Sequence, residues 1–317
     1  MADLDGHASS RHFGALMKTL SNRYSWNERP RAMGLPMIIV HGGAGNWKDE
    51  RIPIGMEFVD KAARIGFVVF EKGGSALDAA EACTVFMESC GELNAGLGAR
   101  PNLDGVRELD AMIVDGSNLT FGSVAAVCDI QNPVSLARYI MEKTDYAFFA
   151  GDNAKRIYKQ MIADGYRIER EPGVIAPAFE IRGADTVGCV AVDSNGNIAA
   201  TSSTGGISKK MPGRVGDSPV MGAGAFANEV CGATATGWGE HIMRVTLTRI
   251  AVLYVEQNLG IQEAADKAMA LFEAKTGSEA GLVMADTHGN WSKATNAKAM
   301  PTTVVAEHLD NISSYTK

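Results

Sequence analysis

Hydroxyl side chains gather at one short stretch of the chain, residues 185–206. The run TVGCVAV that opens at Thr186 is rich in strand formers, and the Asn-Gly pair shortly after it is typical of a tight hairpin turn. The return run ends in SSTGG. Pairing of the two runs about this turn would place Thr186 near Ser203 or Thr204, facing other hydroxyls at the mouth of the hairpin. We interpret Thr186 as a nucleophile.

Hydrophobic periodicity predicts the elements that position this hairpin. A short buried strand is expected at 36–40, and two more hairpins are expected in the ranges 109–127 and 282–295, each around a turn that contains glycine. Ser75 and Asp78 form a capping box at the start of a helix. Helical periodicity is found over six ranges: 58–72, 75–90, 133–143, 153–164, 240–257 and 261–275.

The segments between these elements lack a sustained period. Residues 166–185 carry two prolines and two glycines, which predicts an exposed loop that can be cut without harm to the core. Residues 209–226 are expected to be mostly loop, and the tail after Val305 is expected to fray. We expect residues 1–35 to be an extension and 36–317 to be a single α+β domain, with helices packed outside antiparallel sheet.

Composition narrows the classes of function. The chain has 317 residues, 46% hydrophobic and 21% charged, which is ordinary for a globular protein with a substantial core. The net charge of −7 argues against nucleic acid or an anionic membrane as partner, and no apolar run reaches the ~18–20 residues of a membrane span. The five cysteines form no CxxC pair and the first residues lack the apolar core of a signal peptide, so we expect free thiols and a cytoplasmic location.

The sequence HGGAG, residues 41–45, follows the first expected strand and suggests a phosphate cradle. It lacks the lysine of a GxxxxGK[ST] motif, and the residues after it, Asn46 to Asp49, do not open an obvious helix. We therefore interpret HGGAG as a tight turn under the active site. A nucleotide-binding protein is the distant alternative.

Five motifs in order along the chain, HGGAG, DTVGCVAVD, TSSTGG, GRVGDSP and TATGWGE, resemble the plant-type asparaginases, also called isoaspartyl peptidases. The resemblance covers residues 37–305. It places the chain among the N-terminal-nucleophile hydrolases, near glycosylasparaginase, and implies a four-layer αββα sandwich. It also implies that the chain cuts itself between Asp185 and Thr186 into an α chain (1–185) and a β chain (186–317), and that two such heterodimers form a dimer.

The resemblance implies hydrolysis of small aspartyl compounds, namely the side-chain amide of asparagine and β-aspartyl (isoaspartyl) dipeptides. Self-cleavage frees the α-amine of Thr186. Because an unperturbed α-amine titrates near ~8, it can serve as general base for the hydroxyl of the same residue. None of the six histidines accompanies the motif, in agreement with a base of this kind. The acyl group is then carried on Thr186, and no cofactor is required.

Three matched positions bind the aspartyl part of the substrate in this family. Arg214 falls where a guanidinium holds the α-carboxylate, and Asp217 falls where a carboxylate holds the α-amine. Gly239 falls on the glycine that approaches the same amine. An ion pair between Arg214 and Asp217 is the alternative, purely structural interpretation.

Four more matched positions act at the bond that breaks. Thr204 falls on the threonine that hydrogen-bonds the nucleophile, and Asn94 falls on an asparagine that assists self-cleavage. Thr236 and Gly237 fall on the oxyanion hole, where a hydroxyl and a backbone N–H receive the developing negative charge. The resemblance also implies a structural sodium ion held by the backbone carbonyls of one loop: Met87, Glu88, Cys90, Leu93, Ala95 and Leu97.

Three departures from the family pattern bear on substrate preference. Trp238 stands where asparaginases often have histidine, Asp185 replaces the usual glycine before the nucleophile, and Pro101 interrupts a segment that usually runs into a strand. Asp185 resembles glycosylasparaginase, whose activity is therefore the nearest rival, opposed by HGGAG and TSSTGG. A member of the fold that has lost catalysis is the other rival, opposed by the intact site residues.

Overall fold

The structure is a computed structural model that describes residues 35–166 and 186–317. The described residues belong to one compact unit, 33–317. The expected extension, residues 1–35, falls outside the described part except for its last residue, and so does Asp185 with the segment before it.

Eight strands form the larger of two sheets, in the order β12-β11-β1-β5-β6-β2-β3-β4. Neighbouring strands are antiparallel except for β3 and β4. The expected hairpin at Thr186 is the pair β5–β6, in the middle of this sheet. The strands are β1 (Met37–His41), β2 (Leu109–Asp115), β3 (Thr120–Val127), β4 (Phe148–Ala150), β5 (Val187–Val192), β6 (Ile198–Thr204), β11 (Thr302–Ala306) and β12 (Ile312–Tyr315).

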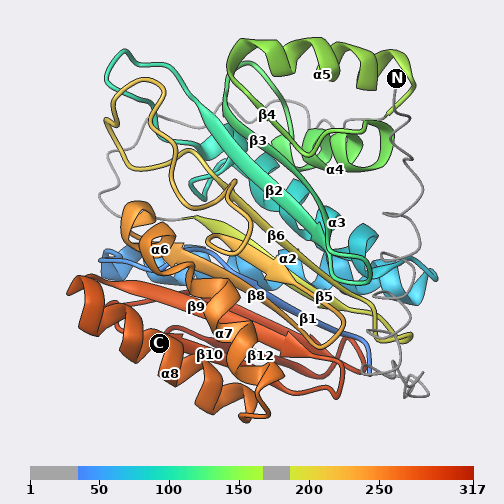
Figure 1. Cartoon of the computed structure of the whole chain (residues 1–317), viewed down its shortest axis with the longest axis vertical. Coiled ribbons are helices and arrows are strands. Elements are labelled where there is room, and N and C mark those ends of the chain that lie inside the picture. The colour runs from blue at the N-terminus through green and yellow to red at the C-terminus, as the bar shows by residue number, and fades with distance from the viewer. Residues whose placement is uncertain (1–34, 167–185) are drawn as a thin grey trace, which may run out of the picture. The chain divides into compact units, whose positions relative to one another are not determined.

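Four strands form the second sheet, in the order β10-β9-β8-β7. The two sheets pack face to face (Figure 1), and Met37 and Ile39 of β1 share a buried cluster with Val283 and Ala285 of β9. This cluster is the core between the sheets. The strands of the second sheet are β7 (Ala225–Ala227), β8 (Cys231–Gly237), β9 (Ala280–Asp286) and β10 (Trp291–Thr295).

Helices cover the outer face of each sheet (Figure 1). The larger sheet carries α2 and α3 over β1, β5 and β6, and α4 over β2 and β3, while α7 and α8 cover the second sheet. The chain therefore forms the four-layer αββα sandwich that the resemblance implied. The helices are α2 (Ile52–Glu71), α3 (Ala76–Ser89), α4 (Pro133–Lys143), α5 (Ala154–Ala163), α6 (Gly239–Val245), α7 (Leu247–Glu256) and α8 (Ile261–Thr276), with short 3-10 turns η1 (Asp49–Arg51), η2 (Gly96–Gly98) and η3 (Gly151–Asn153).

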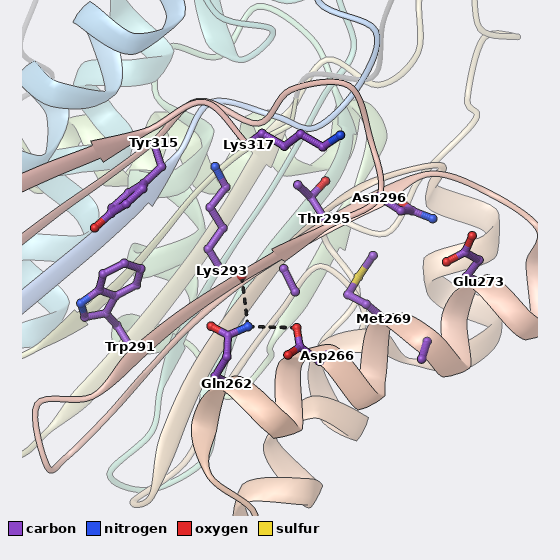
Figure 2. A pocket seen from close by; sticks show the side chains of 12 residues that line it. Gln262, Asp266, Met269, Glu273, Trp291, Lys293, Thr295, Asn296, Tyr315 and Lys317 are labelled. Atoms are coloured by element: carbon purple, nitrogen blue, oxygen red, sulfur yellow. Dashed lines mark hydrogen bonds between the residues drawn. The ribbon is translucent and has the colours of Figure 1, made fainter.

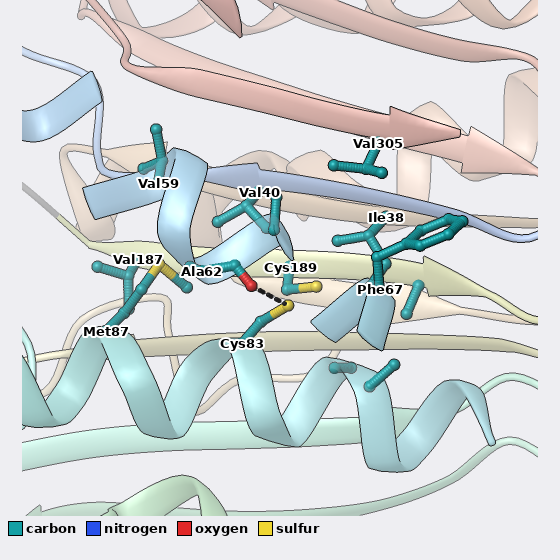
Figure 3. Close-up of a cluster of buried hydrophobic side chains, with 14 of the residues drawn as sticks. Ile38, Val40, Val59, Ala62, Phe67, Cys83, Met87, Val187, Cys189 and Val305 are labelled. Carbon is teal, nitrogen blue, oxygen red and sulfur yellow. Dashed lines mark hydrogen bonds between the residues drawn. The ribbon is translucent and has the colours of Figure 1, made fainter. Parts of the chain in front are cut away.

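Alternation along the central strands sends their side chains into two separate cores. On β1, Ile38 and Val40 pack with the helices, whereas Ile39 packs between the sheets. Figure 3 shows the helix-side cluster, in which Phe67 of α2 and Cys83 of α3 lie near Ile38. A strand buried on both faces has no polar side, which explains why β1 reads as a continuous apolar run.

The start of α3 agrees with the signal in the sequence. α3 begins with the predicted capping box, in which the Ser75 hydroxyl accepts the N–H of Asp78 and the Asp78 carboxylate accepts the N–H of Ser75.

Among the helices of residues 35–166 and 186–317, none combines the length and the apolar character that a membrane crossing needs.

Two expectations about the C-terminal half are wrong. The range 240–257 is divided into α6 and α7 at Thr246, whose φ of +48° is left-handed. The apolar period continues across this break because both helices bury apolar residues against the same sheet. The tail after Val305 is not frayed, because β12 pairs with β11 at the edge of the larger sheet. Exposed Ser313 and Ser314 concealed this strand, since one side of an edge strand meets water.

Gly66 of α2 provides a test of this packing. In an open helix, alanine in place of glycine is favourable by up to about 1 kcal/mol. Here a Cβ on Gly66 would overlap the Sγ of Cys83 and lie 2.7 Å from the Cδ1 of Ile38. We expect Gly66→Ala to lower the free energy of unfolding by about 1–3 kcal/mol in chemical denaturation. Ile65→Ala, at a neighbouring position that is 38% exposed, is the control, and a stabilised Gly66→Ala protein would contradict the packing.

Candidate active site

Thr186 and Thr204 stand opposite each other at the end of the central hairpin. β5 and β6 pair with Val187 opposite Ser203, so the next residues outward are Thr186 and Thr204. Both threonines are buried, with 4% and 3% of their surfaces exposed. This is the pairing that the hairpin pattern predicted.

Alternation along the strands directs three threonines into the space between the sheets. On β5, Val187 packs with the helices and Val190 packs between the sheets, so Thr186 lies on the side of Val190. The same alternation places Thr204 on that side of β6, and Thr236 on the side of β8 that faces the larger sheet. The three hydroxyls are therefore contributed by two sheets to one space.

The two sheets approach closely beside Thr186. Gly188 pairs with His41 of β1, and a Cβ on Gly188 would overlap the Oγ1 of Thr234 and lie 2.5 Å from the Nε2 of His41. Glycine is required here because side chains fill the place that a Cβ would take. Since Thr234 is two residues before Thr236, this contact helps to set the distance between β5, which follows Thr186, and β8, which carries Thr236.

The hydroxyl oxygens of Thr204 and Thr236 each accept a backbone hydrogen bond. The N–H of Gly206 donates to Thr204 Oγ1 at 2.9 Å, and the N–H of Ala44 donates to Thr236 Oγ1 at 3.2 Å. A hydroxyl has one donor and two acceptor sites, so each threonine keeps its hydrogen for a further partner. Thr204 can donate toward Thr186, and Thr236 toward an oxygen held between the sheets.

The HGGAG segment lies under this site through the bond from Ala44. The N–H of Gly42 donates to the carbonyl of Pro301 at 2.9 Å, and the N–H of Gly45 donates to the carbonyl of Ala299 at 3.1 Å. Three amides that a phosphate cradle would need are thus used within the fold. The geometry counts against the nucleotide-binding alternative.

His41 of the same segment is buried and neutral. Burial lowers its pKa to about 3, although a hydrogen bond with the backbone of Thr186 acts in the opposite direction. Its Nε2 lies 3.3 Å from the Oγ1 of Thr234, which ties β1 to the second sheet. A ring with so low a pKa is a poor general base near neutral pH. His41 is therefore a poor candidate for the general base of the expected reaction.

Thr236 and Gly237 end β8 with a hydroxyl and a bare backbone. Thr236 is fully buried. Gly237 has a φ of +148°, which L side chains rarely adopt, and a Cβ there would lie 2.7 Å from the carbonyl oxygen of Glu279. Position 237 therefore requires glycine. A buried hydroxyl beside such a backbone N–H has the composition of an oxyanion hole.

The structure brings Arg214, Asp217 and Gly239 together. A Cβ on Gly239 would lie 2.9 Å from Asp217 Oδ1 and 3.0 Å from Arg214 Nη2. The guanidinium pairs with Glu240, with Nε 2.8 Å from Oε1 and Nη2 2.6 Å from Oε2. Within the described residues this pair replaces the Arg214–Asp217 ion pair that was the structural alternative. Glu240 thus fixes the guanidinium plane and leaves the Nη1 donors outside the pair.

Asp217 is a buried carboxylate with incomplete pairing. It is 3% exposed, and its Oδ2 has no hydrogen-bond partner among the described residues. Burial raises the pKa of Asp217 to about 7, and nearby Arg214 opposes this rise. A buried carboxylate of this kind is destabilising until a cation approaches it. An ammonium group of a ligand would supply that cation.

Charged residues that the sequence analysis did not assign support this part of the site. The side chain of Lys210 is fully buried, with its Nζ 3.7 Å from Glu108 Oε2. Asp110 is also fully buried; burial raises its pKa, opposed chiefly by Lys210. Together with Glu240 they surround the segment that carries Arg214. Charges inside or directly beside apolar strands, as in ELDAMIV, are the sequence signal that could have identified them.

Asn94 connects the glycine-rich loop after α3 to the end of β6. Its Nδ2 donates to the carbonyl of Gly206 at 2.8 Å, and its own carbonyl accepts the N–H of Gly205 at 2.9 Å. Asn94 is 4% exposed. The residue is therefore fixed beside the segment that holds Thr204.

The loop implied to bind sodium presents carbonyl oxygens around two glycines. A Cβ on Gly96 would overlap the carbonyl oxygen of Glu88, and one on Gly98 would overlap that of Leu93. The described residues contain no group of three or more His, Cys, Asp or Glu side chains that could hold a metal. An ion at this loop would therefore depend on carbonyl oxygens, which hard cations accept as ligands. The Glu88 carboxylate is engaged elsewhere, since it accepts the hydroxyl of Ser203 at 2.7 Å.

A hollow of about 540 Å³ lies at the edge of the sandwich, between α8 and the edge strands β10 and β12 (Figure 2). Trp291, Lys293 and Tyr315 line its strand side, and Gln262 and Asp266 line its helix side. The residues that line it do not include Thr186, Thr204, Thr236, Gly237, Gly239, Arg214 or Asp217. The hollow is thus distinct from the candidate active site.

Comparison with known proteins identifies the family of this chain. A family model described as asparaginase matches residues 34–170 and 163–313. An isoaspartyl peptidase/L-asparaginase of Danio rerio is 39% identical over 273 residues, which cover 81% of this chain and 88% of the relative. The Homo sapiens protein of the same name is 38% identical over 285 residues, covering 84% of this chain and 92% of the relative.

An archaeal relative is similar to the same extent. A plant-type L-asparaginase of Pyrococcus horikoshii is 38% identical over 288 residues, covering 83% of this chain and 94% of the relative. The family model spans more than half of the chain, and the relatives match nearly their full length. The chain belongs to the asparaginase family.

Proposed function

We propose that this protein is an amidohydrolase that releases aspartate from L-asparagine and from β-aspartyl dipeptides. Relatives of this chain are named isoaspartyl peptidase/L-asparaginase and plant-type L-asparaginase. The observation that carries the proposal is the incompletely paired carboxylate of Asp217 beside Arg214 and Gly239. An aspartyl substrate has an ammonium for Asp217 and a carboxylate for the free donors of Arg214.

In this mechanism, binding of the two charged groups extends the substrate's side-chain amide toward the three threonines. The α-amine of Thr186 takes the proton of the same residue's hydroxyl, and the oxygen attacks the amide carbon. The hydroxyl of Thr236 and the N–H of Gly237 stabilise the negative charge that develops on the amide oxygen. The amine then returns the proton to the leaving nitrogen, and water hydrolyses the ester on Thr186.

The free α-amine requires a cut before Thr186, which we propose the chain makes itself. The Thr186 hydroxyl attacks the carbonyl of Asp185, the acyl group moves from nitrogen to oxygen, and water cleaves the ester. Thr204 holds the attacking hydroxyl, and Asn94 fixes the neighbouring segment. The neutral, weakly basic His41 supports an amine as the base in the later reaction.

Mass spectrometry and parallel assays test the two parts of this proposal. We expect the purified protein to separate under denaturing conditions into residues 1–185 and 186–317, and to release aspartate from asparagine and from a β-aspartyl dipeptide. Glycosylasparagine is the third substrate, and a clear preference for it would replace the proposed activity by that of glycosylasparaginase. Inactivity toward all three would indicate a silent member of the fold.

The oxyanion hole gives a prediction for Thr236. Thr236→Ala removes one of two donors to the developing charge, so we expect kcat to fall roughly 100- to 1,000-fold with a small change in KM. Thr236→Ser, which keeps the hydroxyl, is the matched control and should retain most of the rate. Equal kcat values for the alanine and serine variants would show that Thr236 does not act on the oxyanion.

Three further features belong to the proposal. A sodium ion at the loop of Met87 to Leu97 would hold the chain next to Asn94 and take no part in the chemistry, which needs no cofactor. We also propose that two αβ heterodimers assemble into a dimer. The cytoplasm suits the unpaired cysteines, because all five are free thiols in this structure.

A further inference from the structure

Trp238 separates the two glycines that serve the two halves of the site. It follows Gly237 of the oxyanion hole and precedes Gly239, which lies against Asp217 and Arg214. Its side chain is 47% exposed, whereas Trp47 in the core is 5% exposed. A single exposed aromatic residue is ordinary on a protein surface, so the position of Trp238 is what makes it informative.

The exposed indole is held in place. Its ring centroid lies 6.1 Å from that of His241, at an interplanar angle of 35°. The Nδ1 of His241 is 2.7 Å from the hydroxyl of Ser278, which fixes the imidazole. The Trp238 backbone carbonyl also accepts the N–H groups of His241 and Ile242 at the start of α6. Trp238 thus presents a positioned aromatic surface to solvent.

The direction of the leaving group follows from which side of the site is buried. The aspartyl half of a substrate is held by Asp217, and the reacting carbonyl lies by Thr236; these residues are 3% and 0% exposed. The leaving half must therefore extend toward solvent. Trp238 lies between Gly237 and Gly239 in the chain and is a large side chain exposed to solvent at this point.

A second group of apolar side chains lies on the loops next to Arg214. Met211 is 66% exposed and Leu103 is 56% exposed. The N–H of Leu103 donates to the carbonyl of Lys210 at 2.9 Å, and the N–H of Arg214 donates to the carbonyl of Met211 at 3.0 Å. The loops beside Arg214 therefore expose two large apolar side chains, Met211 and Leu103.

We propose that Trp238 determines the leaving-group preference of this site, and that the preferred substrates are β-aspartyl dipeptides whose second residue is aromatic or large and aliphatic. The inference rests on the proposed function. A phenylalanyl or leucyl leaving group buries its apolar side chain against the indole of Trp238. A glycyl leaving group, or the ammonia released from asparagine, has no side chain to bury there. Trp238 acts through this contact and takes no part in bond breaking.

The test measures kcat/KM for β-Asp-Phe, β-Asp-Leu, β-Asp-Gly and asparagine. In Trp238→Ala we expect kcat/KM for β-Asp-Phe to fall roughly 3- to 10-fold relative to that for β-Asp-Gly, since an aromatic contact contributes about that factor. Trp238→Phe should keep most of the preference. Phe148→Ala, at a 46% exposed position on the edge strand β4, is the control and should leave all four values unchanged.

The outcomes separate this inference from the proposed function. A parent enzyme that hydrolyses these compounds while Trp238→Ala leaves the ratio of β-Asp-Phe to β-Asp-Gly unchanged overturns the inference alone. A parent enzyme that prefers β-Asp-Gly or asparagine also overturns it. A cleaved parent enzyme that hydrolyses none of the four overturns the proposed function and the inference together.

Discussion

Thr186→Ala is expected to leave the chain in one piece and to lower the hydrolysis of asparagine and β-aspartyl dipeptides by roughly four to six orders of magnitude, to background. The variant lacks both the attacking oxygen and, because it stays uncut, the free amine that serves as base. Denaturing mass spectrometry should show only the mass of the intact chain. The assay is aspartate release at saturating substrate.

Thr186→Ser is the matched control, because it keeps the hydroxyl and loses only the β-methyl that restricts χ1. We expect it to cut itself slowly and to recover part of the activity. An uncut Thr186→Ala protein that still hydrolyses asparagine at the parent rate would remove Thr186 from the mechanism. A parent chain that is active yet uncut would remove the free amine from it.

Asp217→Asn should abolish substrate capture. The amide cannot provide the charge that an ammonium needs in a buried site, so kcat/KM for asparagine is expected to fall roughly 100- to 1,000-fold. The same change should act in the opposite direction on the stability of the ligand-free protein. Burial raises the pKa of Asp217 to about 7, from an ordinary value of 3.8.

The direction in which stability changes with pH follows from proton binding. Between about pH 4 and pH 7 the folded protein binds the Asp217 proton more tightly than the unfolded chain does, so stability falls as pH rises across this window and is level above it. The asparagine side chain in the variant carries no charge, so the Asp217→Asn protein should melt at a higher temperature than the parent at pH 8 and at a similar temperature at pH 4. Thermal melts at both pH values measure this. If the melting temperatures of the two proteins differed by the same amount at pH 4 and at pH 8, this result would contradict the raised pKa of Asp217.

A pH profile of kcat/KM completes this prediction. Because ammonium binding needs the ionised form of Asp217, kcat/KM of the parent should fall as pH decreases below about 7. The proposed base, the α-amine of Thr186, must also be unprotonated, so kcat should fall with decreasing pH too, and the contribution of Asp217 is the additional fall in kcat/KM over that in kcat.

Local signals in the sequence were enough for the central hairpin. Strand formers on both sides of an Asn-Gly pair specify a tight turn, and the turn fixes the register that sets Thr186 opposite Thr204. The four-layer fold and the family followed from ordered motifs rather than from periodicity. The sequence alone located most helices and three hairpins, but it merged α6 with α7, missed the pairing of β12 with β11, and could not assign the strands to two facing sheets.

The partners of buried charges could not be predicted in the same way. Arg214 pairs with Glu240 of α6, although Asp217 is closer to it in the sequence. The partner of Arg214 depends on where a helix that is distant in the sequence begins. The break at Thr246 left no periodic trace, since the helices on each side bury residues against one sheet. The role of Lys210 is likewise set by residues about one hundred positions earlier, Glu108 and Asp110.

The strand order of the larger sheet has a consequence for a chain that is cut before Thr186. Across the sheet from the edge strand β12, the strands β12 and β11 belong to the fragment after the cut, and β1 belongs to the fragment before it. The next two, β5 and β6, belong again to the later fragment, and β2, β3 and β4 belong to the earlier one. The two fragments are therefore interleaved, and β1 cannot leave without breaking its ladders with both β11 and β5. A nicked molecule should stay whole until it unfolds. A cut before Thr186 would place the new chain end next to β5, a strand flanked on both sides, so this end should not fray as an ordinary terminus does.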